Sequence, residues 1–501
     1  MAAVGAVSLV VLAALLVPWD PVPGGSLTAA PAADHFTTEE IARAEEFSQW
    51  ARVWSWSSLV VSLVVACALG FTRAGEALVA RLPGPWVVQV VLAVVSLALI
   101  GRVATLPFSV LMRRRVLDYG LSHQSWAGFA ADLALAEGVG VILTSGAVLV
   151  VVGSARRWQR AWPAVAGAVL GVLVLLGSFA YPLLVEPLFN DFRSLEDGPL
   201  RTEILELADR EGVTVDDVLV ADASRRTTTL NAYVSGIGSS RRVVVYDTLI
   251  DDLTEEQALS VIAHEISHAR HRDVLTASLL GAAGVMLGAG LLGLLYGRAS
   301  WRHAPITDPR AVPRLLALAA VVALLVSPLE STVSRRIETR ADVDALRATD
   351  DPATFIAMQV QLARRSLADP TPPSWSHFWF ASHPTTLKRI ALAERFAGSE
   401  SGSDAKPPAR ANRSLVGSQL QVPEYASSMM VLQLPWNRPS VPPPKANTTT
   451  AIRAAMPAMS RPYSTAEAPA SRRSPARRGL EPWLRAEARN QSSYAFMALS
   501  R

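Results

Sequence analysis

Long apolar stretches, separated by polar segments, dominate the pattern along the chain. Seven occur, at residues 3–18, 54–72, 86–112, 132–153, 162–185, 274–296 and 313–329. A helix needs about 20 mostly apolar residues to cross the hydrocarbon core of a bilayer. Most of the stretches approach that length, and the first and last are the shortest. The pattern predicts a mainly α-helical protein: a polytopic membrane bundle of about seven spans.

The first apolar stretch permits two interpretations. It lacks the positively charged start of a signal peptide, which favours an uncleaved membrane span. Small residues at 29–33 nevertheless offer a cleavage site. An uncleaved span with its N-terminus outside would put residues 186–260 in the cytoplasm, whereas cleavage would put them outside.

Charged residues within and beside the spans leave two questions open. Arg102 and Glu137 interrupt apolar stretches, and charges inside a membrane usually face a bundle interior or a wet cavity. The alternative is that both lie near a membrane interface, in spans that are shorter than drawn. Arg113–Arg115 follow the third stretch, but Arg156 and Arg157 lie on the opposite side, so the positive-inside rule does not settle the orientation.

A mixed aqueous segment lies between the fifth and sixth stretches. An amphipathic pattern predicts a helix over 199–209. Strands are predicted at 218–221, 229–235 and 242–246, the last two joined by a glycine-rich hairpin connection. Thr254 and Gln257 form a capping-box pattern that predicts the start of another helix. The sequence thus predicts a small α+β domain set between membrane spans.

The predicted organisation has six parts, and the last differs sharply in composition. They are 1–53, an N-terminal span and loop; 54–186, spans two to five; 187–273, the aqueous α+β segment; 274–330, spans six and seven; 331–397, a helical segment; and 398–501, a tail. Proline, serine and arginine dominate the tail, and little in it could bury a core. The tail is therefore expected to be disordered.

Composition agrees with a membrane protein and narrows its chemistry. Half of the 501 residues are hydrophobic and 18% are charged, an apolar balance that makes the lipid bilayer an expected partner. The net charge of +4 comes largely from the tail and does not indicate a nucleic-acid partner. The single cysteine, Cys67, excludes a disulfide within the chain and a cysteine-based metal site. A zinc site would therefore have to use histidine and carboxylate ligands.

The helix after Thr254 carries the sequence His264-Glu265-Ile266-Ser267-His268. Residues four apart share a helix face, so both histidines can reach one metal ion, with Glu265 placed to act on a metal-activated water. The alternative is two histidines on a solvated helix. Because the chain has only 8 histidines, a chance match to this motif is rare.

Two histidines leave a catalytic zinc site incomplete, since such a site takes three protein ligands and keeps a position for water. Spans six and seven return the chain to the same side, so the polar helix that begins near Glu330 should emerge beside the His264 helix. Glu338 and Asp342 lie one turn apart on it. We expect Glu338 to be the third ligand of one zinc per chain and Asp342 to hydrogen-bond a ligand histidine. The alternative is a solvated helix with ordinary Arg–Glu pairs.

These motifs together resemble a known family. The sequence from about 54 to 396 resembles the integral-membrane zinc metalloproteases of the M48 peptidases, of the Ste24/CAAX prenyl protease type, with HtpX as a neighbouring branch. The similar segments are 264–268, 334–342, Asn231–Gly236, Tyr246–Leu249 and Ser382–Pro384. The tail after 398 is not part of this pattern.

The resemblance implies an activity, a ligand set and a location. It implies a zinc metalloendopeptidase in which His264, His268 and Glu338 hold the zinc and Glu265 is the general base. Asp342 is implied to lie just outside the zinc ligands and to act as a catalytic proton donor. Its substrates are expected to be membrane proteins or hydrophobic peptides. It also implies an active site that faces the cytoplasm, and the Ala-, Val- and Arg-rich composition favours a prokaryotic cell membrane.

Two further groups are candidates for contact with the substrate. His383 could donate a hydrogen bond to the oxyanion of the tetrahedral intermediate, or it could simply belong to a His-Pro turn. Asn231, Ala232 and Tyr233 could pair with an extended substrate as an added strand, or they could form a plain hairpin.

A function of another class remains open: a transporter, or an inactive scaffold, with a structural zinc. Glu265 argues against both, because a structural site has no need of a base and usually closes with four protein ligands.

Overall fold

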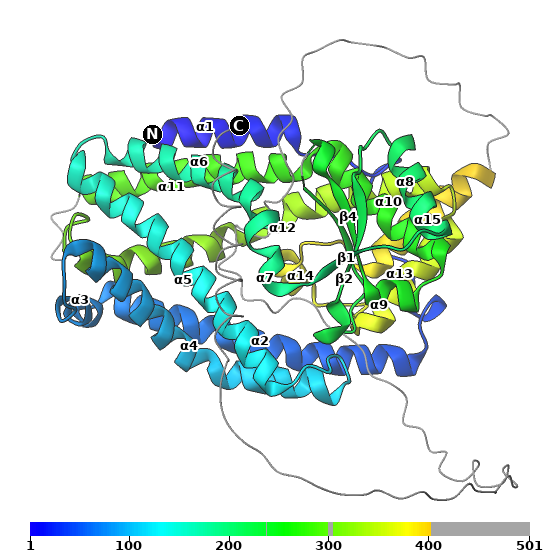
Figure 1. The fold of residues 1–501 in the computed structure, drawn as a ribbon, viewed down its shortest axis with the longest axis horizontal. Helices are drawn as coiled ribbons and strands as arrows, with labels where there is room; N and C mark the ends of the chain where they lie inside the picture. Colours follow the sequence, from blue (N-terminus) through cyan, green and yellow to red (C-terminus); the bar gives the residue numbers. More distant parts are fainter. Residues whose placement is uncertain (237, 299–303, 402–501) are drawn as a thin grey trace, which may run out of the picture. The chain divides into compact units, whose positions relative to one another are not determined.

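The computed structural model describes residues 1–236, 238–298 and 304–401, so most of the predicted tail lies outside the described residues. Among these residues, six helices are long and apolar enough to cross a membrane (Figure 1). They are α2 (Thr38–Phe71), α4 (Trp86–Asp118), α5 (Trp126–Arg157), α6 (Trp162–Leu184), α11 (Asp273–Arg298) and α12 (Val312–Thr349). The predicted fold class, a mainly helical membrane bundle with a small α+β part, is confirmed.

The first apolar stretch forms a shorter helix, α1 (Ala2–Leu16), rather than a seventh long one. Its 15 residues rise only about 22 Å, less than the ~30 Å of a bilayer core. It packs along α11, where a Cβ on Gly5 would lie closer than 3.0 Å to the backbone of Leu287. A Cβ on Gly290 would likewise lie closer than 3.0 Å to the backbone of Ala2. Glycine at both positions lets the two helix backbones approach closely.

The segment after α1 runs over two helices of the aqueous part, α13 (Pro352–Ser366) and α15 (Thr386–Ser401). Arg395 of α15 donates hydrogen bonds to three of its backbone carbonyls, at 2.9 to 3.1 Å. Phe36 is buried in a cluster with Ile390. The N-terminal residues therefore pack against both the membrane helices and the aqueous part.

Arg102 and Glu137 lie within α4 and α5 and form an ion pair. Arg102 Nε donates to Glu137 Oε2 at 2.8 Å, and both side chains are largely covered. Each helix continues for several turns on either side of the pair. The two charged residues therefore pair with each other across the neighbouring helices α4 and α5.

A four-stranded mixed sheet forms the centre of the aqueous part, in the order β1-β2-β4-β3. The strands are β1 (Phe192–Ser194), β2 (Asp217–Ala221), β3 (Ala232–Ser235) and β4 (Arg242–Tyr246). β3 and β4 are antiparallel, as the predicted hairpin requires, and β2 runs parallel to β4. The sequence pattern missed β1, which has only three residues and pairs with β2. β3 lies at the edge of the sheet.

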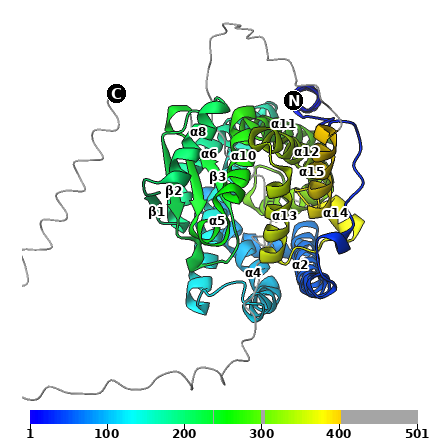
Figure 2. The ribbon, with the colours of Figure 1, turned by 90° about the vertical axis from the view of Figure 1, so that its right-hand side faces the viewer.

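Helices surround the sheet and connect it to the bundle (Figure 2). The remaining helices are α3 (Arg73–Ala80), α7 (Glu186–Phe189), α8 (Pro199–Arg210), α9 (Asp247–Asp252), α10 (Glu255–His271) and α14 (Ser374–Phe380). α10 begins at the predicted capping box of Thr254 and Gln257 and packs against both β3 and α12. It ends at Arg272, whose left-handed φ of 56° turns the chain into α11.

α12 is one continuous helix of 38 residues, which contains both the predicted seventh span and the polar helix after it. Side chains of Ile262, Ile266 and Leu346 are buried in the core that α10 and α12 share with the sheet. The segment of α12 that carries Glu338 and Asp342 is thus a continuous extension of a membrane helix.

Glu186 occupies the junction between α6 and the sheet. Ser235 Oγ of β3 donates to Glu186 Oε2 at 3.1 Å, and the Glu186 side chain is buried. Tyr233, two residues before Ser235, packs edge-to-face on Tyr246. Burial raises the pKa of Glu186 to about 7 and also raises the pKa of Tyr233. A carboxyl group that is partly neutral at pH 7 therefore lies between α6 and the four-stranded sheet.

We predict that Glu186 makes stability fall as the pH rises. Its pKa is raised from 4.5 to about 7 in the folded protein, so its stabilising contribution is full below about pH 4.5 and is lost as the pH rises through 7. The loss is on the order of 2–3 kcal/mol. The thermal unfolding midpoint in detergent, measured between pH 5 and pH 8, should fall less in Glu186→Gln than in the wild type. The exposed Glu203→Gln is the control, and equal pH dependence in all three proteins would contradict the prediction.

Candidate metal centre

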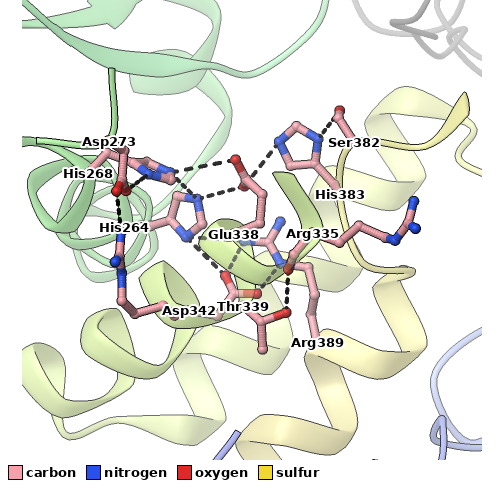
Figure 3. A network of polar contacts seen from close by, with 11 residues as sticks. His264, His268, Asp273, Arg335, Glu338, Thr339, Asp342, Ser382, His383 and Arg389 are labelled. Carbon is pink, nitrogen blue, oxygen red and sulfur yellow. Dashed lines mark hydrogen bonds and ion pairs between the residues drawn. The ribbon is translucent and has the colours of Figure 1, made fainter. Parts of the chain in front are cut away.

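α10 supplies two converging imidazoles (Figure 3). His264 and His268 lie four residues apart on the helix face turned towards α12, and Ile262 and Ile266 pack into the core. The two Nε2 atoms are 3.2 Å apart, and His264 is buried. The spacing that the sequence pattern identified therefore brings two nitrogen donors to one point.

α12 supplies a carboxylate to the same point. Glu338 Oε2 lies 3.2 Å from His264 Nε2, and Glu338 Oε1 lies 3.7 Å from His268 Nε2. One ligand atom from each of the three residues lies within 4.8 Å of the other two. Glu338 thus faces the histidines instead of pairing with arginines on a solvated surface.

The donor atoms fit a zinc ion in type and spacing. Zinc holds imidazole nitrogen and carboxylate oxygen at about 2.0–2.2 Å, so tetrahedral ligands lie roughly 3.3–3.5 Å from one another. The three separations here are 3.2, 3.2 and 3.7 Å. Two imidazoles and one carboxylate are also a known ligand set of catalytic zinc.

The outward nitrogen of His264 is held by Asp342. Asp342 Oδ1 lies 2.9 Å from His264 Nδ1, and the carboxylate is almost fully buried. Arg389 of α15 in turn donates from Nε to Asp342 Oδ2 at 2.9 Å. The contact of Asp342 follows the predicted helix spacing. The sequence pattern did not identify Arg389. The feature that could have indicated it is its position directly before Ile390, a buried residue of α15.

The outward nitrogen of His268 is held in the same way by Asp273. Asp273 Oδ2 lies 2.8 Å from His268 Nδ1, and its other oxygen pairs with Arg340 of α12. The sequence analysis assigned no role to Asp273 or Arg340. The feature that could have indicated Asp273 is its position as an acidic residue at the start of the apolar helix α11.

Nearby negative charge dominates the electrostatics of the histidines. Burial by itself would lower the pKa of His264, but hydrogen bonds to Asp342 and Glu338 raise it. The pKa of His268 rises to about 10, because the charge of Glu338 and the hydrogen bond to Asp273 outweigh burial. The site is therefore built to attract a cation.

Glu265 and His383 lie beside this cluster. Glu265 follows His264 in α10 and is half-buried, and its charge contributes to the raised pKa of His268. His383 Nε2 lies 3.1 Å from Glu338 Oε2, although the His383 side chain is 53% exposed. Arg335 of α12 donates to the backbone carbonyl of Ala381 at 2.6 Å and so holds the segment that carries His383. The His-Pro turn therefore reaches the cluster.

The three candidate substrate-contacting residues lie at the edge strand β3. Ala232 points into the core, and the ring of Tyr233 packs against Tyr246. Asn231 precedes the strand, and its carbonyl accepts a hydrogen bond from the Tyr246 N–H at 2.9 Å. In the described part of the chain, β3 pairs with β4 alone.

A bundle of membrane helices with a His-Glu-x-x-His helix and a carboxylate from a second helix defines an integral-membrane metallopeptidase. Comparison with protein families agrees: residues 194–397 match the model of peptidase family M48, and residues 28–191 match that of the CAAX prenyl protease N-terminal segment of five membrane helices.

Individual relatives agree as well. The chain is 30% identical over 331 residues to the uncharacterised metalloprotease YhfN of Bacillus subtilis, covering 63% of this chain and 76% of that protein. It is 28% identical over 249 residues to CAAX prenyl protease 1 of Saccharomyces cerevisiae, covering 45% of this chain and 54% of the yeast protein. The chain belongs to peptidase family M48, a family of zinc metalloendopeptidases.

A solved structure shows the same fold. The crystal structure of S. mikatae Ste24p matches with a TM-score of 0.64 at 20% sequence identity. The match covers 78% of this chain and 98% of that chain.

We predict that Glu338→Ala weakens metal binding strongly, because it removes a carboxylate whose oxygens lie 3.2 and 3.7 Å from the two imidazole Nε2 atoms. Metal content and affinity of the purified protein, measured by competition with a chelator, test this. Glu330→Ala, two turns earlier on α12, is the matched control. Unchanged affinity in Glu338→Ala would remove Glu338 from the ligand set.

Proposed function

We propose that this protein is a membrane-embedded zinc metalloendopeptidase with one zinc per chain, bound by His264, His268 and Glu338. The observation that carries the proposal is the convergence of these three side chains from α10 and α12. Membership of a metalloprotease family supports the choice of reaction. Its substrates are membrane proteins or hydrophobic peptides, which can reach a site carried on helices that continue into the membrane.

The roles of the residues follow from their positions. A bound zinc supplies Lewis acidity for water activation and carbonyl polarisation. Glu265 accepts the proton of the attacking water and later delivers it to the leaving amine. His383, which already reaches Glu338, donates a hydrogen bond to the oxyanion of the tetrahedral intermediate. Asp342 keeps the proton of His264 on Nδ1, so that Nε2 remains a donor to the metal.

The edge strand β3 provides a place for the substrate backbone. An extended peptide added to its outer edge would continue the sheet through main-chain hydrogen bonds. α10 packs against β3, so the peptide would lie beside the helix that carries Glu265. The backbone at Asn231, Ala232 and Tyr233 would then position the scissile bond.

The alternative of a transporter or scaffold with a structural zinc has less support. Among the described residues three candidate ligands converge, whereas a structural site usually has four protein ligands. Family membership also points to peptide hydrolysis.

We further propose that the metal centre faces the cytoplasm of a prokaryotic cell. The family resemblance supports this orientation, and a Bacillus relative supports the prokaryotic setting. Arginines lie at both ends of the bundle. Arg113–Arg115 precede a loop that contacts the aqueous part, where Ser122 hydrogen-bonds the carbonyl of Arg226. Arg156 and Arg157 lie at the far end, where Arg156 donates a hydrogen bond to the carbonyl of Thr307.

We predict that Glu265→Gln abolishes peptide hydrolysis while zinc and fold survive. Glutamine keeps the shape of the side chain but cannot accept the proton of water, and losing a general base typically costs 10²–10⁴-fold in rate. The measurement is turnover of a fluorogenic peptide in detergent or liposomes, with zinc content determined on the same samples.

Glu256→Gln, in the exposed first turn of α10, is the matched control and should retain wild-type turnover. Near wild-type turnover of zinc-loaded Glu265→Gln would refute the assignment of the base and revive the transporter alternative.

Cysteine labelling tests the orientation. With Cys67 replaced, single cysteines at the exposed Asp251 and Ser382 should both be protected from an impermeant reagent in intact cells. A cysteine at the exposed Arg157, at the far end of the bundle, should be labelled. Labelling of the first two positions from outside would reverse the proposed orientation.

A further inference from the structure

Both metal-facing histidines have the same kind of support on their outward nitrogens. His264 contacts Asp342, which pairs with Arg389 of α15, an element of the aqueous part. His268 contacts Asp273, which pairs with Arg340 of α12. The second chain of contacts differs from the first, because both of its supporting residues lie on the helices that continue into the membrane.

Asp273 occupies a structural junction. It is the first residue of α11 and follows the left-handed Arg272 that ends α10. One carboxylate oxygen faces His268 Nδ1 at 2.8 Å, and the other faces the guanidinium of Arg340. The side chains of Asp273 and Arg340 are 8% and 17% exposed. The carboxylate therefore bridges the metal-facing helix and two membrane helices.

We propose that Asp273, held by Arg340, is a positioning residue that orients His268 and makes metal binding depend on the ion pair that joins the start of α11 to α12. The inference rests on the metal site of the proposed function and adds a structural link between that site and the membrane bundle. The inference is based on geometry: among the described residues, Asp273 supplies the carboxylate that lies 2.8 Å from His268 Nδ1.

The physical argument concerns the imidazole ring. A carboxylate that accepts the Nδ1 proton fixes the tautomer and the ring orientation, and it makes Nε2 a stronger donor to a metal. Arg340 balances the charge of Asp273 and stops the carboxylate from rotating away. Without Asp273, His268 would keep its place on α10 but lose the partner that fixes its ring.

A simpler role for Asp273 predicts a different result. An acidic residue in the first turn of a helix interacts favourably with the helix dipole. That role would change the stability of α11 but leave zinc affinity unaltered. Metal affinity therefore separates positioning from capping.

The experiment measures zinc binding by competition with a chelator, using the full chain in detergent. Asp273→Asn should bind zinc about 10–100-fold more weakly than the wild type. Arg340→Gln should weaken binding in the same direction. The double variant should be no weaker than Asp273→Asn alone, because the two residues act through one contact. Arg336→Gln, one turn earlier on α12 and exposed, is the control and should bind as the wild type does.

A second readout reports the ligand geometry directly. Cobalt-loaded Asp273→Asn should have an altered visible spectrum, and Asp273→Glu should restore part of the affinity. If Asp273→Asn does not fold, Arg340→Lys and Arg340→Gln carry the test, with lysine expected to retain more affinity. Unchanged zinc affinity and cobalt spectra in variants of both residues would overturn this inference alone. A wild-type protein that binds no zinc would overturn the proposed metal site and this inference together.

Discussion

The crossing of α10 and α12 is the contact on which the site depends. One helix carries two imidazoles and the other carries the carboxylate, so the 3.2 Å separation between His264 and Glu338 exists only while the two helices keep their packing. That packing comes from buried apolar residues on both sides, among them Ile266 and Leu346. The same core fixes β3 against α10. The burial of hydrophobic residues thereby sets the distances between the two histidines and Glu338.

The charged residues around the metal centre obey a second constraint. Burying a charge is costly unless it is paired and hydrogen-bonded. Asp342 and Asp273 each satisfy this by contacting a histidine on one side and an arginine on the other. The arginines lie outside the candidate ligand set, and each forms an ion pair with one buried carboxylate. Residues from four helices therefore support the three candidate metal ligands.

The sequence predicted those site residues whose positions follow from helical periodicity or from the even number of spans between two segments. Helical spacing identified His264, His268 and Glu265, and the return of two spans to one side identified Glu338. It did not predict Arg389 or Arg340, because nothing local shows which distant carboxylate an arginine will meet. Short elements such as β1 were missed because three residues carry too little pattern.

Continuity between the membrane and the site distinguishes this fold from a soluble peptidase on an anchor. α12 passes without a break from its apolar half to Glu338, and α11 begins at the residue that supports His268. A helix transmits displacement along its axis better than a loop does, since its backbone hydrogen bonds are internal. The ion pair of Asp273 with Arg340 joins the start of α11 to α12 beside His268, so a displacement of either membrane helix would reach the metal-facing imidazole through this pair.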